Sequence, residues 1–238
     1  MEVHAHTHTP RKKWTHYFWE FIMLFLAVFS GFLAEYQLEH MIEKERGKQY
    51  IHSIREDLCT DTTQCGIQIA ELTQKESVLQ NMPACFDTIT GKTGSTDCLK
   101  KIVMHSIGFA DFIYTDRTIQ QLKYAGGLRL IQNKSIADSI IAYDALVREM
   151  HIHQEVLENQ QQIAVTAHNS MIAYSSRTNR KITEKLILLS RDNRELNKYF
   201  NEITAFRKGC RRQLQLITEI KARATRLLIF LDNKGFKN

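Results

Sequence analysis

The feature that most constrains this chain is an apolar run near its amino end, WTHYFWEFIMLFLAVFSGFLA, over residues 14–34. Between Phe21 and Ala34 the run carries no charge. The hydrocarbon core of a bilayer requires about 20 apolar residues in a helix, and the run reaches this length with its leading aromatic residues. Such rings are typical of the headgroup level. We therefore expect a transmembrane helix over residues 14–36, preceded by a flexible His-containing tail over residues 1–13.

Three other interpretations of the run are weaker. Glu20 lies inside it and Glu35 closes it, and a carboxyl group in a membrane is often functional. Near an interface such a group is readily hydrated or protonated, which we favour over a proton relay. A cleavable signal peptide is disfavoured, because Phe32-Leu33-Ala34 puts a bulky residue where cleavage needs a small one. A buried core helix is the third alternative.

Small residues recur on one side of the expected membrane helix at spacings of three and four. This pattern lets two membrane helices approach closely. We expect this face to support self-association, with a patch that faces lipid as the alternative. The residues are Ala27, Ser30, Gly31 and Ala34.

Charges beside the run predict its orientation. Residues 11–13 (RKK) directly precede it, whereas Lys44, Arg46 and Lys48 follow at a greater distance. Because basic residues near a span favour the cytoplasmic side, the nearer group predicts a cytoplasmic N-terminus. We therefore expect a single-pass protein of the inner (plasma) membrane with an extracytoplasmic C-terminal domain.

The remainder of the chain indicates an all-α protein. It has 2 prolines and 10 glycines in 238 residues, too few turn breakers for an all-β fold. Apolar residues recur at helical spacing, and a heptad-like stripe runs from Ile136 to Tyr174. We expect the membrane helix to continue as a stalk helix (37–82), followed by a loop (83–97) and a helical bundle with coiled-coil packing (98–238).

Five cysteines are an odd number, so at least one has no intramolecular partner. Cys85 and Cys98 flank the expected loop, and we predict a disulfide between them in an oxidising compartment. Cys59 and Cys65 are six residues apart, a poor spacing for a pair within one helix. Cys210 lies in an apolar helical pattern and is expected in the core.

No catalytic signature stands out. The sequence contains no HExxH, GxSxG, GxGxxG, CxxC or ExxH motif. Residues 90–95 (TGKTGS) are reminiscent of a phosphate-binding loop, but Phe86 stands where its first glycine belongs. The alternating His4, His6 and His8 can chelate Cu(II), Ni(II) or Zn(II), yet nothing rigid holds them. We expect no catalysis, no cofactor and no metal site.

The end of the chain is basic. From Arg177 onward 16 lysines and arginines stand against 6 acidic residues. The basic side chains gather on one face of the last expected helix, where they could meet anionic headgroups or nucleic acid, or remain solvated. Nucleic acid is disfavoured, because no known binding module is present. The face comprises Arg191, Arg194, Arg207, Lys208, Arg211 and Arg212.

Two stretches carry a resemblance. The opening has a His-bearing tail, then residues 11–14 (RKKW), Glu20 and residues 31–35 (GFLAE). The central motif comprises residues 118–123 (TIQQLK), 126–134 (GGLRLIQNK), 137–140 (ADSI) and Tyr143. Together they resemble an uncharacterised family of bacterial membrane proteins with one N-terminal span. The resemblance implies a membrane anchor with a helical domain and supplies no catalytic residues.

These patterns favour a non-enzymatic membrane protein that acts as a structural, interaction or scaffold component of the cell envelope. Long helices expose apolar stripes that must be buried, within one chain or between chains. The expected partners are the lipid bilayer and either a second copy, as a homo-oligomer, or another membrane protein. An extracytoplasmic sensory or ligand-binding bundle is the alternative, against which the lack of a sizeable cytoplasmic output domain counts. In a third hypothesis the domain faces the cytoplasm and binds nucleic acid or anionic lipid.

Overall fold

The computed structural model describes residues 13–108, 111–173 and 186–236. Within these ranges the chain is helical, and the only extended pairing is a single antiparallel bridge between Ile172 and Leu188. The all-α prediction is confirmed for this part of the chain. The elements are α1 (Trp14–Leu79), α2 (Met82–Thr90), α3 (Asp97–Ser106), α4 (Arg117–Tyr124), the 3-10 helix η1 (Gly127–Leu130), α5 (Lys134–Met171) and α7 (Asn193–Asn233).

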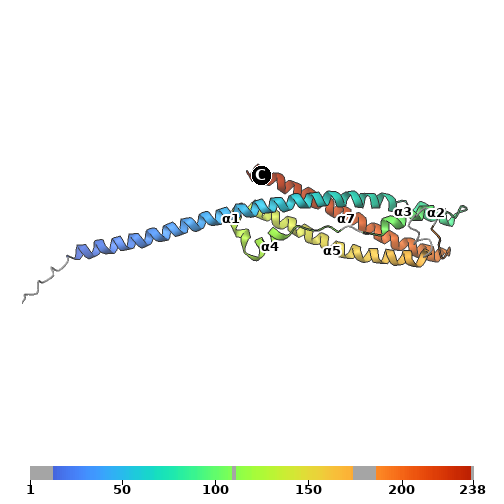
Figure 1. Ribbon diagram of the computed structural model, residues 1–238, viewed down its shortest axis with the longest axis horizontal. Coiled ribbons are helices and arrows are strands. Elements are labelled where there is room, and N and C mark those ends of the chain that lie inside the picture. Colours follow the sequence, from blue (N-terminus) through green and yellow to red (C-terminus); the bar gives the residue numbers. More distant parts are fainter. Residues whose placement is uncertain (1–12, 109–110, 174–185, 237–238) are drawn as a thin grey trace, which may run out of the picture.

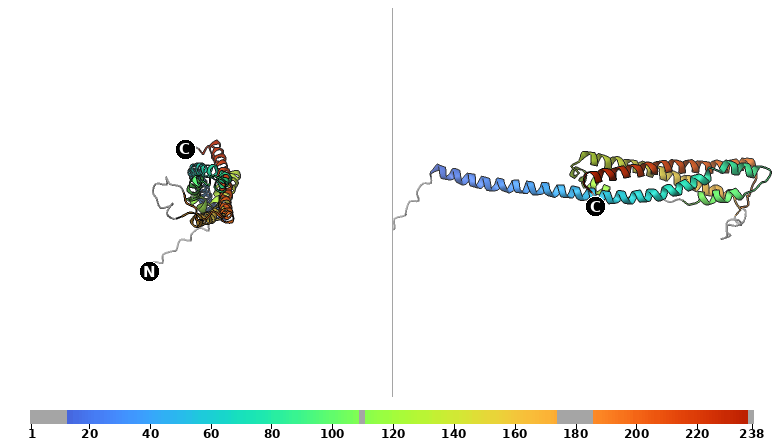
Figure 2. Two further views of the ribbon diagram at one scale, coloured as in Figure 1. Left: turned by 90° about the vertical axis from the view of Figure 1, so that its right-hand side faces the viewer. Right: turned by 90° about the horizontal axis from the view of Figure 1, so that it is seen from above.

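One helix dominates the shape. α1 has 66 residues, which at 1.5 Å per residue makes it about 100 Å long. Its first half projects from an elongated bundle, and its second half lies alongside α7, which in turn packs against α5 (Figure 1). α2 and α3 cover the far end of this bundle, and α4 lies near the point where α1 leaves it (Figures 1 and 2). We call the end at which α1 leaves the proximal end.

The bundle has two consecutive hydrophobic cores. The core nearer the proximal end includes Leu58 of α1, Val147 of α5 and Ile217 of α7. The farther core includes Leu157 and Phe206 and extends under α2 and α3. The apolar stripe that begins at Ile136 is the buried face of α5. The long helices therefore bury their stripes within one chain.

Two expected segments differ in the structure. Most of the expected loop at 83–97 is helical, since α2 runs from Met82 to Thr90. Pro83 lies in the first turn of α2, where its missing N–H breaks no helical hydrogen bond. The expected stalk helix at 37–82 is present as the continuation of α1 to Leu79, but from Gly47 onward it is packed into the bundle. Only residues 37–46 bridge the apolar run and the bundle.

Side-chain caps fix where two long helices begin. Asp192 Oδ1 accepts hydrogen bonds from the backbone N–H groups of Arg194 (2.9 Å) and Glu195 (3.2 Å) at the start of α7. Asn133 Oδ1 accepts one from Ile136 N at 3.3 Å at the start of α5. Such caps satisfy N–H groups that have no partner within the helix. The cap at Asn133 begins α5 at the proximal end, directly after the short α4–η1 segment.

Candidate functional site

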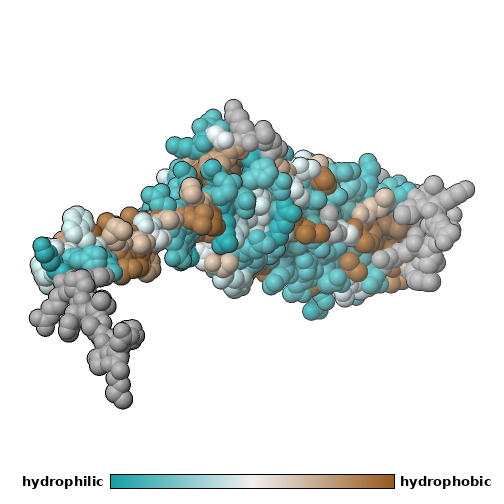
Figure 3. Space-filling model, turned by 60° about the vertical axis from the view of Figure 1, so that its left-hand side comes forward, coloured by the Kyte–Doolittle hydropathy of each residue, from teal (hydrophilic) through white to brown (hydrophobic). Residues whose placement is uncertain are grey.

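The projecting half of α1 exposes its apolar side chains. No part of its apolar run is buried against protein, and Phe32, for example, is 67% exposed. Figure 3 shows hydrophobic surface along this projection, whereas the surface of the bundle is mostly hydrophilic. In length and composition, α1 is a candidate for a single membrane span.

The aromatic residues at both ends of the run fit the dimensions of a bilayer. The hydrocarbon core is about 30 Å thick, and the headgroups extend the bilayer to about 40–45 Å. Centred on the charge-free run 21–34, hydrocarbon would cover roughly residues 18–37 and headgroups would reach roughly residues 13 and 42. Trp14 and Tyr36, both exposed, then fall at or near the two headgroup layers.

The small-residue face of the run is open. Ala27, Ser30, Gly31 and Ala34 are all exposed, and a Cβ added to Gly31 would meet no atom within 4 Å. Ser30 Oγ donates to the carbonyl of Ala27 at 2.9 Å, so its hydroxyl is satisfied within the helix. None of the residues that the structure describes covers this face, and self-association through it stays a prediction.

Glycines allow η1 to pack directly against α1 where the bundle begins. A Cβ on the buried Gly47 would lie 2.3 Å from the carbonyl oxygen of Leu130, so the contact requires glycine. Gly126 has φ +64°, a left-handed conformation that glycine adopts without strain, and turns the chain from α4 into η1. A Cβ on Gly127 would lie 3.2 Å from Tyr50 Cε2. The central motif thus docks η1 on α1.

This docking encloses a polar pocket of about 460 Å³ between α1, α4 and η1. Two guanidinium groups line it, that of Arg46 on α1 and that of Arg129 on η1, and no carboxylate does. Glu43 lies 3.7 Å from Arg129, whereas Arg46 has no ion pair in the described part of the chain. We call it the Arg46–Arg129 pocket. Its other lining residues are Gln49, Tyr50, Ser53, Gln121, Ala125 and Leu130.

Two buried carboxylates on α1 hold the segment that leads into α4. Asp57 Oδ1 accepts a hydrogen bond from Arg117 Nε at 2.6 Å. Asp61 accepts hydrogen bonds from Thr115 N (3.0 Å) and from the Tyr143 hydroxyl (2.7 Å). Burial raises the pKa of Asp61 above its ordinary value, and these two hydrogen bonds oppose the increase. The carboxylates attach α4 to α1 and α5.

A second hollow, also about 460 Å³, lies between α4, α5 and the segment before α4. Its buried Asp144 pairs with Lys123 at 2.5 Å and with Arg148. Gln154 Oε1 is buried and has no hydrogen-bond partner among the described residues. Burial raises the pKa of Tyr114, so its phenol keeps its proton and can donate. The hollow is therefore lined by a phenol that can donate and by Gln154, whose amide oxygen is buried.

A buried polar cluster joins α3, α5 and α7. Ser106 Oγ lies 2.6 Å from His168 Nε2, and His168 Nδ1 lies 2.9 Å from the Tyr199 hydroxyl. These distances are like those of a nucleophile and its base. All three side chains are almost fully buried, and Ser106 Oγ also donates to the carbonyl of Ile102 at 2.6 Å. With no access for a substrate, the cluster is structural.

The cysteines occupy three kinds of surroundings. Cys85 of α2 and Cys98 of α3 form a disulfide with Cα atoms 5.6 Å apart. Cys65 and Cys210 are buried, and burial raises the pKa of each thiol to about 12. Cys59 is exposed on α1. Cys59 is therefore the accessible thiol among the described residues.

The predicted basic face is divided among several elements. Arg207 forms a bidentate ion pair with Glu76 of α1 at 2.9 and 3.2 Å. Arg191 donates to a backbone carbonyl between α2 and α3 at 3.0 Å, and Arg212 lies 3.3 Å from a carboxylate of α5. Glu76 lies about 60 Å beyond the apolar run along α1, too far for headgroup contact by an upright bundle. The other three residues, Arg194, Lys208 and Arg211, are exposed.

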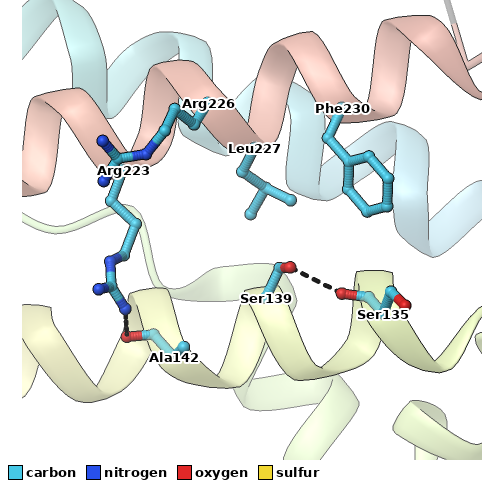
Figure 4. Close-up of a pocket in the computed structure, with 7 residues that line it drawn as sticks. All are labelled: Ser135, Ser139, Ala142, Arg223, Arg226, Leu227 and Phe230. Carbon is cyan, nitrogen blue, oxygen red and sulfur yellow. Dashed lines mark hydrogen bonds between the residues drawn. The ribbon is translucent and has the colours of Figure 1, made fainter.

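A groove of about 450 Å³ lies between the start of α5 and the end of α7. Figure 4 shows the side chains that line it. Arg223 and Arg226 line it together with the apolar Leu227 and Phe230. The guanidinium of Arg223 turns toward α5, with Nη1 3.5 Å from the carbonyl oxygen of Ala142. This groove and the Arg46–Arg129 pocket each have two arginines and similar volumes.

Metal ligands do not gather in the described ranges, where no three His, Cys, Asp or Glu side chains could hold an ion together. His4, His6 and His8 lie outside those ranges. Sequence reasoning missed the partners of Asp57 and Asp61, the Arg46–Arg129 pocket and the hollow beside Gln154. In the sequence, only the glycines of the central motif could have indicated the close approach of η1 to α1 that forms the pocket.

Comparison with protein-family models, with curated proteins and with solved structures gave no match for this chain. The function must therefore be argued from the apolar span, the pockets and the bundle surface themselves.

Proposed function

We propose that this chain is a single-span, non-catalytic membrane protein whose bundle is an interaction module of the cell envelope. The exposed apolar run of α1 supports the anchor, and both hydrophobic cores support a bundle that packs as one chain. The partner would be a second copy or another membrane protein. One surface of α5 carries the proposal.

That surface is a row of apolar side chains on the outside of α5. Ile141, Ile152, Val156 and Ile163 are 43, 67, 52 and 47% exposed. At 100° per residue they fall on one side of the helix, opposite the buried stripe, and extend over about 33 Å. A row of exposed apolar residues on a helix is typical of a surface that binds another protein. We call it the α5 outer row.

Photocrosslinking in native membranes tests this surface. A photoreactive amino acid at Ile152 or Ile163 is expected to yield discrete crosslinked protein products. The same group at Thr225, an exposed polar position on α7, serves as the control. Equal crosslinking from all three positions would contradict a specific interface, and the mass of the products distinguishes a second copy from a different protein.

We further propose that the bundle is extracytoplasmic. The basic residues 11–13 before the apolar run support this orientation, as does the Cys85–Cys98 disulfide, because disulfides persist in oxidising compartments. The exposed Cys59 provides a native probe. A membrane-impermeant maleimide is expected to label Cys59 in cells whose inner membrane is intact. Labelling that requires lysis of that membrane would support the cytoplasmic alternative.

Ligand binding by the bundle is a second candidate, favoured by the unpartnered oxygen of Gln154 in its hollow. A buried acceptor without a donor costs about 1–3 kcal/mol, which a bound ligand could offset. Gln154→Leu removes this acceptor. In a thermal-shift screen of amino acids and small amines, a ligand of the hollow would stabilise the unaltered chain and not Gln154→Leu. If no compound separates the two proteins, this candidate fails.

A further inference from the structure

We propose that the Arg46–Arg129 pocket binds the phosphate of an anionic phospholipid headgroup, in the leaflet from which α1 emerges. The inference rests on the proposed function, because it requires α1 to span the bilayer. It assigns a ligand to the proximal end of the bundle, and the argument has three parts: the level of the pocket, its chemistry and its construction.

The pocket lies at the level of the headgroups. With the bilayer centred on the charge-free run, the headgroup layer ends near Ile42. Arg46 is one turn of helix farther along α1, a rise of about 6 Å. An extended arginine side chain covers this distance. Arg129 is held at the same level, because the adjacent Leu130 contacts α1 at Gly47.

The chemistry of the pocket favours an anion. A guanidinium group matches the oxygens of a phosphate and can donate two parallel hydrogen bonds to it. Two such groups line the pocket without a lining carboxylate, so a cationic ligand such as a choline group would be repelled. Of the acids near the pocket, Glu43 pairs with an Arg129 side chain that is largely exposed, and such pairs contribute little, whereas Glu45 pairs with Lys48 at 3.2 Å.

The remaining lining groups suit the other part of a headgroup. Gln49 and Gln121 offer amide groups, and Tyr50 and Ser53 offer hydroxyls, all of which can bind the hydroxyls of a glycerol headgroup. Phosphatidylglycerol combines such hydroxyls with a net negative phosphate. It therefore serves as the probe.

The pocket is built before a ligand arrives. Gly47 and Gly127 bring η1 and α1 into direct contact, and the two arginines flank that contact from different elements. The pocket therefore differs from a basic face on a single helix, where the charges are solvated and attract counterions. A bound headgroup would also fix the tilt of the bundle relative to the bilayer.

The groove lined by Arg223 and Arg226 provides a matched control. Arg55 pairs with Asp232 at 3.0 Å, and Lys221 lies beside Gly66, so this groove lies between the levels of residues 55 and 66 of α1. These levels are about 20–35 Å beyond the headgroup layer. The control has the same number of arginines at a height that headgroups do not reach.

The experiment uses the full chain in nanodiscs made from equal amounts of phosphatidylcholine and phosphatidylglycerol. Native mass spectrometry then identifies the lipids that stay bound when the protein is released. The unaltered protein is expected to retain phosphatidylglycerol in preference to phosphatidylcholine by roughly 25-fold, since two arginines near the surface contribute a factor of about five each. R46Q/R129Q is expected to lose this preference, and R223Q/R226Q to keep it.

All four arginines are at least partly exposed, so both double variants should have the same Tm as the unaltered protein. Equal retention of the two lipids by the unaltered protein, or an undiminished preference in R46Q/R129Q, overturns the inference while the membrane anchor stands. A chain that does not incorporate into nanodiscs overturns the proposed function as well.

Discussion

The two halves of α1 belong to one continuous helix and differ in what covers their apolar side chains. In the first half, between Trp14 and Ala34, these side chains surround the helix and are largely exposed. Between Gly47 and Leu79 they form a stripe that packs mainly against α7, with α3, α4 and η1 also in contact, while the opposite side is polar. A helix that is apolar all round requires hydrocarbon, whereas a striped helix requires a protein neighbour.

The difference shows that the change of surroundings takes place within a short stretch. Gly47, the first buried residue of α1, follows the last exposed apolar residues by about one turn. η1 and the Arg46–Arg129 pocket occupy this boundary. Because the helix is not interrupted there, the bundle would be held at a fixed distance from the bilayer.

Removal of a core side chain has the largest expected effect on stability, and it distinguishes the packed half of α1 from the projecting half. Leu58→Ala leaves a cavity in the proximal core and is expected to cost about 2–5 kcal/mol. This corresponds to a decrease of roughly 5–15 °C in Tm for a chain of this size. Leu26→Ala, at an exposed position of the projecting half, should leave the melting of the bundle unchanged.

Thermal unfolding in detergent, followed by circular dichroism, measures both variants. Equal losses would contradict the division of α1, since they would mean that Leu26 is packed against protein.

Two glycines provide the next comparison. Gly47→Ala places a Cβ against the backbone of Leu130 and is expected to cost about 1–3 kcal/mol by displacing η1. Gly31→Ala meets open space and should not destabilise the bundle. The same melting experiment applies. A Gly47→Ala variant as stable as the unaltered protein would show that η1 does not depend on this close contact.

The buried carboxylate of Asp61 is expected to give a smaller, pH-dependent effect on stability. Burial raises the pKa of Asp61 in the folded chain above its unfolded value. Between these two pKa values the folded state holds the extra proton, so stability falls as pH rises through this window. Asp61→Asn does not titrate, and its amide can still accept from Thr115 and donate to Tyr143.

The Tm of Asp61→Asn relative to the unaltered protein should therefore increase as the pH is raised from about 4 toward neutrality. Melting curves of both proteins across this range measure the difference. Parallel Tm curves would mean that Asp61 has an ordinary pKa.

A substitution in the small-residue face of α1 is expected to have the smallest effect on stability. Gly31→Leu introduces bulk where two membrane helices would approach closely, and it should reduce chemical crosslinking between copies in membranes. The melting of the bundle should not change, because a Cβ added to Gly31 would meet no atom of the described residues within 4 Å. Undiminished crosslinking would assign any self-association to another surface, with the α5 outer row as the first candidate.

Local patterns were sufficient to predict the helices and the candidate span. The apolar run, the scarcity of proline and the stripe that begins at Ile136 each depend on residues close together in the chain. The loop expected at 83–97 is wrong for most of its length, because Pro83 stands in the first turn of a helix, where proline is well tolerated.

Contacts between distant residues escaped prediction. Asp57 meets Arg117, and Arg46 lines a pocket with Arg129, across separations that no periodicity reveals. His168 was noticeable only as a polar residue at a core position of the α5 stripe. Its partners Ser106 and Tyr199 come from other helices, so the cluster required the fold.

The central claim is that lipid surrounds the first half of α1, and the native tryptophans test it most directly. The two tryptophans of the sequence, Trp14 and Trp19, both lie in that half. In vesicles of phosphatidylcholine with brominated acyl chains, their fluorescence is expected to be strongly quenched relative to vesicles of the unbrominated lipid. Equal fluorescence of the incorporated protein in both lipids would contradict the account, because it would mean that protein surrounds these rings.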